Sequence, residues 1–200
     1  MQIEFDNLSP TAAYHLITQT VIPRPIAWVL TKNVDGQSHN LAPFSYFSAV
    51  SSEPPLLMFS CAAKPEGGLK DTVINTLREE KLVIHIATET QLQALQDSAQ
   101  PLNYGDSEVA LIAADLCDFA GTGQQRLSGA PIAFACRLHH SDTVGKAQTL
   151  IFAEIESVYI DDAAVSKNGK RLRIDAKTIA PLGRLGLGQF VTLADVVMPQ

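Results

Sequence analysis

Apolar residues recur along this chain in short runs rich in β-branched side chains, a pattern typical of strands rather than of long helices. The expected strands are residues 26–31, a strand beginning near residue 38, and residues 56–61, 82–87, 131–140 and 148–160, with a turn at 142–146. Most neighbouring strands are joined by short, hairpin-like connections. About six or seven strands connected in this way, with two or three helices, predict a mainly β fold: an antiparallel barrel with helices outside it.

Helical patterns are few. Ser9 and Pro10 match an N-cap and a first helical residue, so a short helix is expected there, ending before Pro23. Further helices are expected over residues 70–80 and 89–99. Their inward-facing residues are expected to be Val73, Ile74 and Leu77 in the first and Leu92 and Leu95 in the second.

Two polar stretches interrupt this pattern. Residues 103–128 show no clear period and several glycines, which favours a long functional or interface loop. Residues 167–170 (KNGK) predict a basic surface turn.

The hairpin at residues 23–47 carries more polar detail than its two strands require. Its first strand opens with Pro23-Arg24-Pro25, and the two prolines partly fix the direction of the guanidinium group. Asp35-Gly36 provides the turn. Arg24 is therefore a candidate for contacting an anion or a ring edge, and a surface salt bridge is the alternative.

Composition limits the class of protein. Two hundred residues suggest a single domain over 1–200, and 46% hydrophobic against 18% charged residues predicts a well-buried globular chain. The net charge of −6 with no evident basic patch argues against nucleic acid as a partner. No apolar run approaches the roughly 20 residues of a membrane span, and no signal peptide is expected. Three widely spaced cysteines, Cys61, Cys117 and Cys136, suggest reduced thiols in a cytoplasmic protein.

The start of the helix expected at residue 70 suits a phosphate, because free backbone N–H groups and a partial positive charge meet there. Glycines precede it, Lys70 adds charge and Thr72 adds a hydroxyl group. The alternative is that Asp71 or Thr72 only caps the helix. Asn40, Ser45 and Ser60 are expected on the same wall, although each could equally be an ordinary satisfied polar residue.

Other chemistry finds no support in the sequence. The histidines lack the spacing of metal ligands, so no metal is expected. The glycines of residues 183–188 follow the order GxxGxG without a following βαβ unit, which excludes a dinucleotide fingerprint.

Four blocks of sequence give the chain a specific resemblance. It resembles the flavin reductase-like family of FMN-binding split-barrel proteins in PRPIAWVLT (residues 23–31), NLAPFSYFSAVSSEPPLLMFS (40–60), KDTVIN (70–75) and LVIHIA (82–87). The tail PLGRLG (181–186) fits more loosely, and Phe190 stands where the family often has a tyrosine, so it cannot donate a hydroxyl hydrogen bond. The resemblance implies an antiparallel split barrel, FMN as cofactor and a homodimer with the flavin near its interface.

The resemblance also implies a set of cofactor-binding residues. Arg24, Pro25 and Thr31 would lie near the flavin ring, which Asn40, Leu41, Ala42 and Ser45 would line. Ser60, Lys70, Asp71 and Thr72 would surround the phosphate, and Arg184 would approach from the tail.

The expected reaction is hydride transfer from NAD(P)H to flavin N5, with electrons passing on to a second acceptor. Backbone N–H groups of residues 40–45 and a cation such as Arg24 are expected to stabilise negative charge on the reduced ring, and no catalytic acid or base is expected. Two alternatives stay open: an FMN-binding electron-transfer protein without NAD(P)H activity, and a cofactor-free barrel that acts as a binding module.

Overall fold

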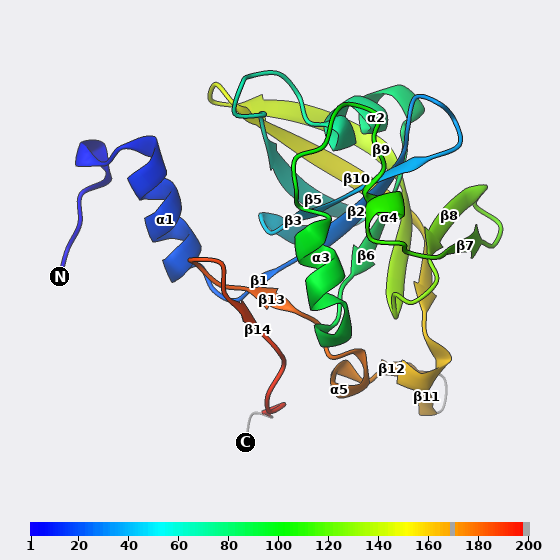
Figure 1. Ribbon diagram of the computed structural model, residues 1–200. Helices are drawn as coiled ribbons and strands as arrows, with labels where there is room; N and C mark the ends of the chain where they lie inside the picture. The colour runs from blue at the N-terminus through cyan, green and yellow to red at the C-terminus, as the bar shows by residue number, and fades with distance from the viewer. Residues whose placement is uncertain (169–170, 198–200) are drawn as a thin grey trace.

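A single curved sheet of seven antiparallel strands forms most of the protein in the computed structural model, which describes residues 1–168 and 171–197 (Figure 1). The strand order is β3-β2-β6-β9-β10-β5-β4. The strands are β2 (Ala27–Lys32), β3 (His39–Phe44), β4 (Phe47–Ser52), β5 (Pro55–Ala62), β6 (Lys81–Ile86), β9 (Ile132–Val144) and β10 (Gln148–Ile160). The prediction of a mainly β, antiparallel fold with flanking helices is confirmed.

The two edges of this sheet are consecutive strands in the chain. Only Ser45 and Tyr46 separate β3 at one edge from β4 at the other, so the sheet must curl for the chain to pass between them. The backbone N–H of Ser60 in β5 donates to the carbonyl of Tyr46 at 2.8 Å. Because β3 and β4 do not pair, the described residues form a split barrel rather than a closed one. The predicted second strand of the hairpin is thus two strands, and Ser45 lies in their connection.

Smaller elements surround the sheet. The short sheets are β1 (Arg24–Pro25) with β13 (Gly183–Arg184) and β14 (Phe190–Val191), β7 (Leu116–Phe119) with β8 (Gln124–Leu127), and β11 (Val165–Asn168) with β12 (Arg171–Ile174). The helices are α1 (Pro10–Thr20), α2 (Asp71–Glu79), α3 (Leu92–Asp97), α4 (Glu108–Leu111) and α5 (Ala176–Ile179), with 3₁₀ turns η1 (Phe5–Asn7), η2 (Glu89–Gln91) and η3 (Asp162–Ala164). Residues 169 and 170 of the expected basic turn lie outside the described residues. No described helix is both long and apolar enough to cross a membrane.

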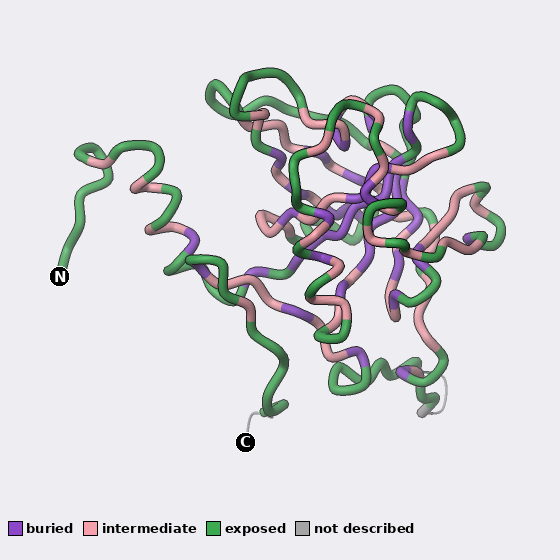
Figure 2. Tube along the Cα trace, viewed as in Figure 1, coloured by how far each residue is buried: buried purple, intermediate pink, exposed green. Residues whose placement is uncertain are grey.

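Both faces of the central strands are buried, because successive side chains point to opposite sides and each side is covered (Figure 2). The cluster inside the barrel includes Phe59, Ile84 and Ile151, and Val73 of α2 packs against it. The outer cluster has these members from the sheet and its covering elements: Trp28, Leu30, Leu41, Val83, Leu95, Phe119 and Leu127. The flavin-site candidates on β2 and β3 therefore stand between two packed cores.

The predicted apolar stripe of helix α2 is confirmed at Val73 and wrong at Leu77, and most of the residues that the helix buries are polar. Thr72, Asn75 and Thr76 are buried together with Val73, whereas the side chain of Leu77 is 43% exposed. The pattern did not reveal this face because Thr72 and Asn75 bond to polar side chains of β2, β3 and the loop between them.

Three other segments differ from or match the expectations. Strand β10 has the predicted bounds, whereas β9 is longer than predicted, since it continues through residues 141–144, which are exposed and paired only with β10. Residues 103–128 are not irregular throughout, because they contain α4 and the β7–β8 hairpin. Helix α1 is confirmed, with the Ser9 side chain accepting a hydrogen bond from the Ala12 N–H at 3.2 Å. It extends away from the sheet, and Thr18 is its only buried residue (Figures 1 and 2).

Candidate functional site

The connection between β3 and β4 brings the two predicted halves of the site together. The Ser45 hydroxyl oxygen accepts a hydrogen bond from Arg24 Nε at 3.4 Å. One residue earlier, the ring of Phe44 lies 5.8 Å from the Lys70 ammonium at the start of α2. Arg24 therefore lies on one side of this bend in the chain, and Lys70 at the start of α2 lies on the other.

Arg24 is buried and largely engaged by the chain itself. Its side chain is 5% exposed, and besides Ser45 it donates to the backbone carbonyls of Thr18, Val21 (3.0 Å) and Leu185 (3.1 Å). A guanidinium has five N–H donors, so these four hydrogen bonds leave one for a ligand. Arg24 ties the end of α1 and the C-terminal tail to the barrel, and its charge rather than its donors is what it can offer a ligand.

Arg184 lies directly across from Arg24 in the β1–β13 ladder. Its guanidinium is 4.2 Å from the ring centre of Phe190, so the residue that lacks a tyrosine hydroxyl provides a cation–π partner instead. Burial is the main reason that the pKa of Arg184 is lowered, and the charge of Arg24 adds to it. Among the described residues no carboxylate forms an ion pair with either arginine, so this corner of the molecule carries uncompensated positive charge.

A cavity of about 320 Å³ opens beside the arginine pair. Its lining includes Ile26, Pro43, Ser45, Leu95, Arg184 and Phe190. Tyr14 and Gln96 also line it, and this mixture of apolar side chains with a cation, hydroxyl groups and an amide suits a flat ring with a polar edge. Pro25, by contrast, is exposed and pairs with Gly183, so it shapes the entrance of β1 more than the cavity itself.

The start of α2 presents Lys70, which forms no ion pair with a carboxylate of the described residues. Lys70 is the N-cap residue, and its side chain makes no capping hydrogen bond. The neighbouring Asp71 is engaged on both carboxylate oxygens, by Lys64 Nζ at 2.8 Å and by the Gly105 N–H at 3.1 Å. The helix end, with Lys70 beside it, is therefore the part of the predicted phosphate site that remains available to an anion.

Thr31, Asn40 and Thr72 belong to a buried polar network rather than to an open surface. Asn40 Nδ2 donates to Thr72 Oγ1 at 2.9 Å and to Thr31 Oγ1 at 3.2 Å. Asn75 Nδ2 reaches Thr31 Oγ1 at 3.3 Å and Asn33 Oδ1 at 3.0 Å. The network fixes α2 against β2 and β3. Sequence reasoning missed Asn33 and Asn75, although Asn75 belongs to the KDTVIN block.

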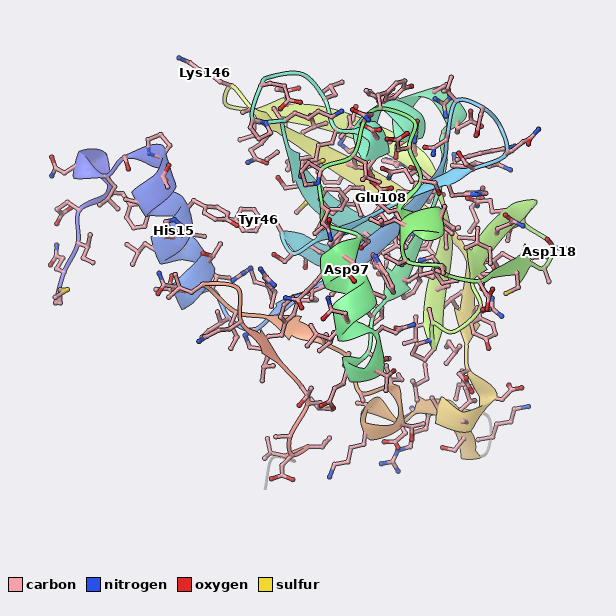
Figure 3. The ribbon with its side chains drawn as sticks, viewed as in Figure 1. His15, Tyr46, Asp97, Glu108, Asp118 and Lys146 are labelled. Atoms are coloured by element: carbon pink, nitrogen blue, oxygen red, sulfur yellow. The ribbon has the colours of Figure 1, made fainter. Side chains whose placement is uncertain are left out.

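The outer edge of β3 is covered by residues that the sequence analysis left in a loop. Glu108 of α4 is buried, and its Oε2 accepts the Leu41 N–H at 2.9 Å (Figure 3). Burial raises the pKa of the Glu108 carboxyl group, and the hydrogen bond from Leu41 opposes that shift. The Ser107 hydroxyl group donates to the His39 carbonyl at 2.6 Å. No motif in the sequence pointed to Glu108.

This arrangement corrects the expected role of the backbone N–H groups at residues 40–45. In an antiparallel strand the N–H and C=O of one residue point to the same side. The outward N–H of Leu41 is taken by Glu108, and Pro43 has none. The β3 edge therefore offers carbonyl acceptors, and negative charge on a ligand depends on Ser45 and the two arginines.

The remaining predicted residues lie between these groups. The Ser60 hydroxyl donates to Gln148 Oε1 at 2.9 Å, and the Ser60 backbone N–H donates to the Tyr46 carbonyl. Ala42 packs against the inner cluster opposite Val29. The structure thus brings together Arg24, Ser45 and Arg184 at one end, and Lys70 and Asp71 at the other.

Comparison with known proteins gives consistent matches over most of the chain. A family model described as "Flavin reductase like domain" matches residues 19–174. An uncharacterized protein from Aquifex aeolicus is 31% identical over 180 residues, covering 89% of this chain and 88% of that protein. The crystal structure of nitrilotriacetate monooxygenase component B from Bacillus cereus has a TM-score of 0.91 and 25% identity, covering 100% of this chain and 98% of that one. Pseudomonas fluorescens 2-nitrobenzoate 2-nitroreductase NbaA has a TM-score of 0.89 and 28% identity, covering 100% and 95%.

Proposed function

This chain belongs to the flavin reductase-like domain family, and from that membership we propose that it is an FMN-dependent oxidoreductase that takes hydride from NAD(P)H and passes electrons to a second acceptor. Its structural likeness to a monooxygenase component and to a nitroreductase supports a flavin oxidoreductase. The acceptor differs between such proteins, so the chain's own residues support the cofactor more directly than the acceptor.

The main structural support is that the Ser45–Tyr46 connection separates two positively charged groups, the arginine pair Arg24 and Arg184 and the lysine at the start of α2. Lys70 and the start of α2 fit the FMN phosphate, and the cavity beside Arg184 fits the ring. The carbonyl groups of the β3 edge fit the ring's N–H donor. One ligand with an anionic tail and a flat, polar-edged ring satisfies both ends.

When bound, FMN would supply the hydride-accepting N5 atom and hold the electrons. The chain's residues would bind and orient it. Arg24 and Arg184 would offset negative charge at the ring edge, and the apolar walls formed by Ile26, Pro43 and Leu95 would keep water from the ring face. Hydride transfer of this kind requires no catalytic acid or base from the chain.

The three free cysteines fit a reducing compartment, and we infer that the protein works in the cytoplasm. Cys61 and Cys136 are buried, and burial raises the pKa of each thiol to about 12. Such thiols are protonated at neutral pH and poorly reactive, so they act as small apolar core residues.

Stopped-flow mixing of the FMN-loaded protein with NADH and with NADPH tests the proposal. We expect the visible flavin band to bleach with at least one donor, faster than for free FMN under the same conditions. A protein whose flavin is reduced only by a protein donor would be an electron-transfer flavoprotein and would contradict the NAD(P)H step. A colourless protein that fails to bind added FMN would contradict the cofactor itself and leave a binding module.

A further inference from the structure

Basic residues form a row across the sheet at the end of β2 that lies farthest from Arg24. In the β2–β3 ladder Lys32 pairs with His39, and in the β6–β9 ladder Lys81 pairs with Arg137. Strands β2 and β6 pair Leu30 with Val83, and continuing this register by two residues places Lys32 opposite Lys81. Residues two apart share one face of a strand, so the row lies on the same face as Leu30 and Val83.

The two outer residues of the row, His39 and Arg137, add no unbalanced positive charge. Arg137 Nη2 is 2.7 Å from Glu154 Oε1 on β10. Burial, followed by the charge of Lys32, lowers the pKa of His39 and keeps its ring neutral at pH 7. Neither Lys32 nor Lys81 has an acidic partner in the part of the chain that the structure describes. Like charges directly opposite each other destabilise a sheet. Lys32 and Lys81 would therefore be stabilised by a negatively charged ligand between them.

A cavity of about 270 Å³ lies over the two lysines. Leu30 and Val83 contribute to its lining from the sheet, and Gln124 and Gln125 of β8 contribute from the covering hairpin. The amide nitrogen of Gln124 is buried and has no hydrogen-bond partner among the described residues.

No described group on the rim of this cavity neutralises the positive charge of the two lysines. Lys81 Nζ is 3.4 Å from the Thr122 carbonyl, which holds it beside the β7–β8 turn. Glu79 also lines the cavity, but its carboxylate is paired with Arg78 Nε at 2.8 Å. The cavity therefore combines two exposed ammonium groups with an unused amide donor, a set that suits an acceptor-rich anion.

We propose that the cavity under the β7–β8 hairpin binds a small polyanion, a phosphate-bearing or polycarboxylate molecule, through Lys32, Lys81 and the Gln124 amide. A ligand with at least two negative charges would offset both ammonium groups, and an acceptor atom on it would pair with the amide. The site lies on the outer face of the sheet, whereas α2 packs against the inner cluster. It is thus separate from the flavin site proposed above and does not depend on it.

Isothermal titration calorimetry of the FMN-loaded protein tests the proposal, with inorganic pyrophosphate and citrate as probes and sodium chloride at matched ionic strength as the blank. We expect at least one probe to bind the native chain. The double variant Lys32→Gln/Lys81→Gln should bind it about tenfold or more weakly, because each charge-assisted hydrogen bond contributes substantially to affinity. Comparing pyrophosphate with citrate distinguishes phosphate from carboxylate ligands.

Lys146→Gln/Lys167→Gln is the matched control, since it changes the net charge equally at two exposed lysines, one at the tip of the β9–β10 hairpin (Figure 3). This control should retain native affinity. Gln124→Leu keeps both lysines and should also weaken binding. It tests the site if the double lysine variant does not fold. Lack of binding to the native chain, equal losses in both double variants, or displacement of the probe by FMN added in excess would overturn the proposal.

Discussion

Arg24 holds parts of the fold together and keeps a positive charge beside the proposed ring site. The carbonyl groups of α1 and of the C-terminal tail accept its hydrogen bonds, so the guanidinium is solvated by the chain and needs no carboxylate. A carboxylate at this place would cancel the charge beside the 320 Å³ cavity. The side chain therefore holds three segments in place while its positive charge remains for a ligand.

His85 is a buried titratable group that links stability to pH. Its Nδ1 bonds to the Trp28 carbonyl at 3.0 Å, and its Nε2 accepts the Leu127 N–H at 3.0 Å, so the ring is neutral with its proton on Nδ1. Burial lowers the His85 pKa from 6.5 to about 4. Between pH 6.5 and about 4 the unfolded chain binds a proton at His85 and the folded chain does not. The contribution of neutral His85 to stability is therefore complete above pH 6.5 and decreases as the pH falls below it.

We predict that the free energy of unfolding falls as pH decreases from 6.5 towards about 4, and that His85 contributes at most about 3 kcal/mol of that fall. His85→Gln should be less stable at pH 7 and should show a shallower pH slope across this window. His140→Gln, at an exposed histidine, should keep the native slope. Urea unfolding at several pH values measures all three proteins. A native slope in His85→Gln would contradict the assignment.

Helix α2 stands over the inner cluster through hydrogen bonds as well as apolar contacts. Asn40 and Asn75 connect it to β2 and β3, so the position of its N-terminus is fixed by side chains that are themselves buried. Removing Thr72 would disturb this network as well as any phosphate contact. Lys70, which makes no capping bond, is the residue whose removal isolates the phosphate contact.

We predict that Lys70→Ala weakens FMN binding about tenfold, or by about 1.4 kcal/mol, and leaves riboflavin binding nearly unchanged. Only FMN carries the phosphate that Lys70 and the helix end would contact. Quenching of flavin fluorescence on titration gives both dissociation constants. Lys167→Ala, at an exposed lysine on β11, is the control and should affect neither ligand. Equal losses for FMN and riboflavin would place the phosphate elsewhere.

Sequence patterns predicted the strands in which apolar residues are buried on both faces. They missed features that depend on contacts between residues far apart in the sequence. Strands β2, β5 and β6 were evident because both of their faces are apolar. The start of α2 was also evident, from its glycines and Lys70. Glu108 was not, because its importance comes from the Leu41 N–H, 67 residues away.

The split of the expected second strand into β3 and β4 was equally hidden from pattern analysis. The bend at Ser45 and Tyr46 interrupts no hydrophobic pattern, and it is set by pairing with β2 on one side and β5 on the other. The polar face of α2 escaped prediction for a related reason. Its partners Thr31 and Asn33 belong to a strand and a loop about 40 residues earlier in the chain.

The molecule as a whole leaves one side of the barrel uncovered. Strand β4 is an edge strand, and its residues from Ser48 to Ser52 are exposed. Helix α1 stands away from the sheet, with Tyr14 55% exposed and its ring 6.4 Å from that of Tyr46 (Figures 1 and 3). An unpaired edge next to a projecting helix is a surface that soluble proteins usually cover. Because Ser45 lies just before β4, a covering subunit would also reach the proposed flavin site, as in the homodimer that the family resemblance implies.

We predict that the protein is a dimer in solution and that Val50→Lys, in the middle of β4, raises the dimer dissociation constant at least about tenfold. A lysine there would bring an unpaired charge into the edge that the partner covers. Val144→Lys is the matched control, because Val144 on β9 is 52% exposed and Val50 is 45% exposed. Size-exclusion chromatography with light scattering, over a range of protein concentrations, measures the association of each. A monomeric native protein would contradict the dimer, and an equal effect of both substitutions would move the interface away from β4.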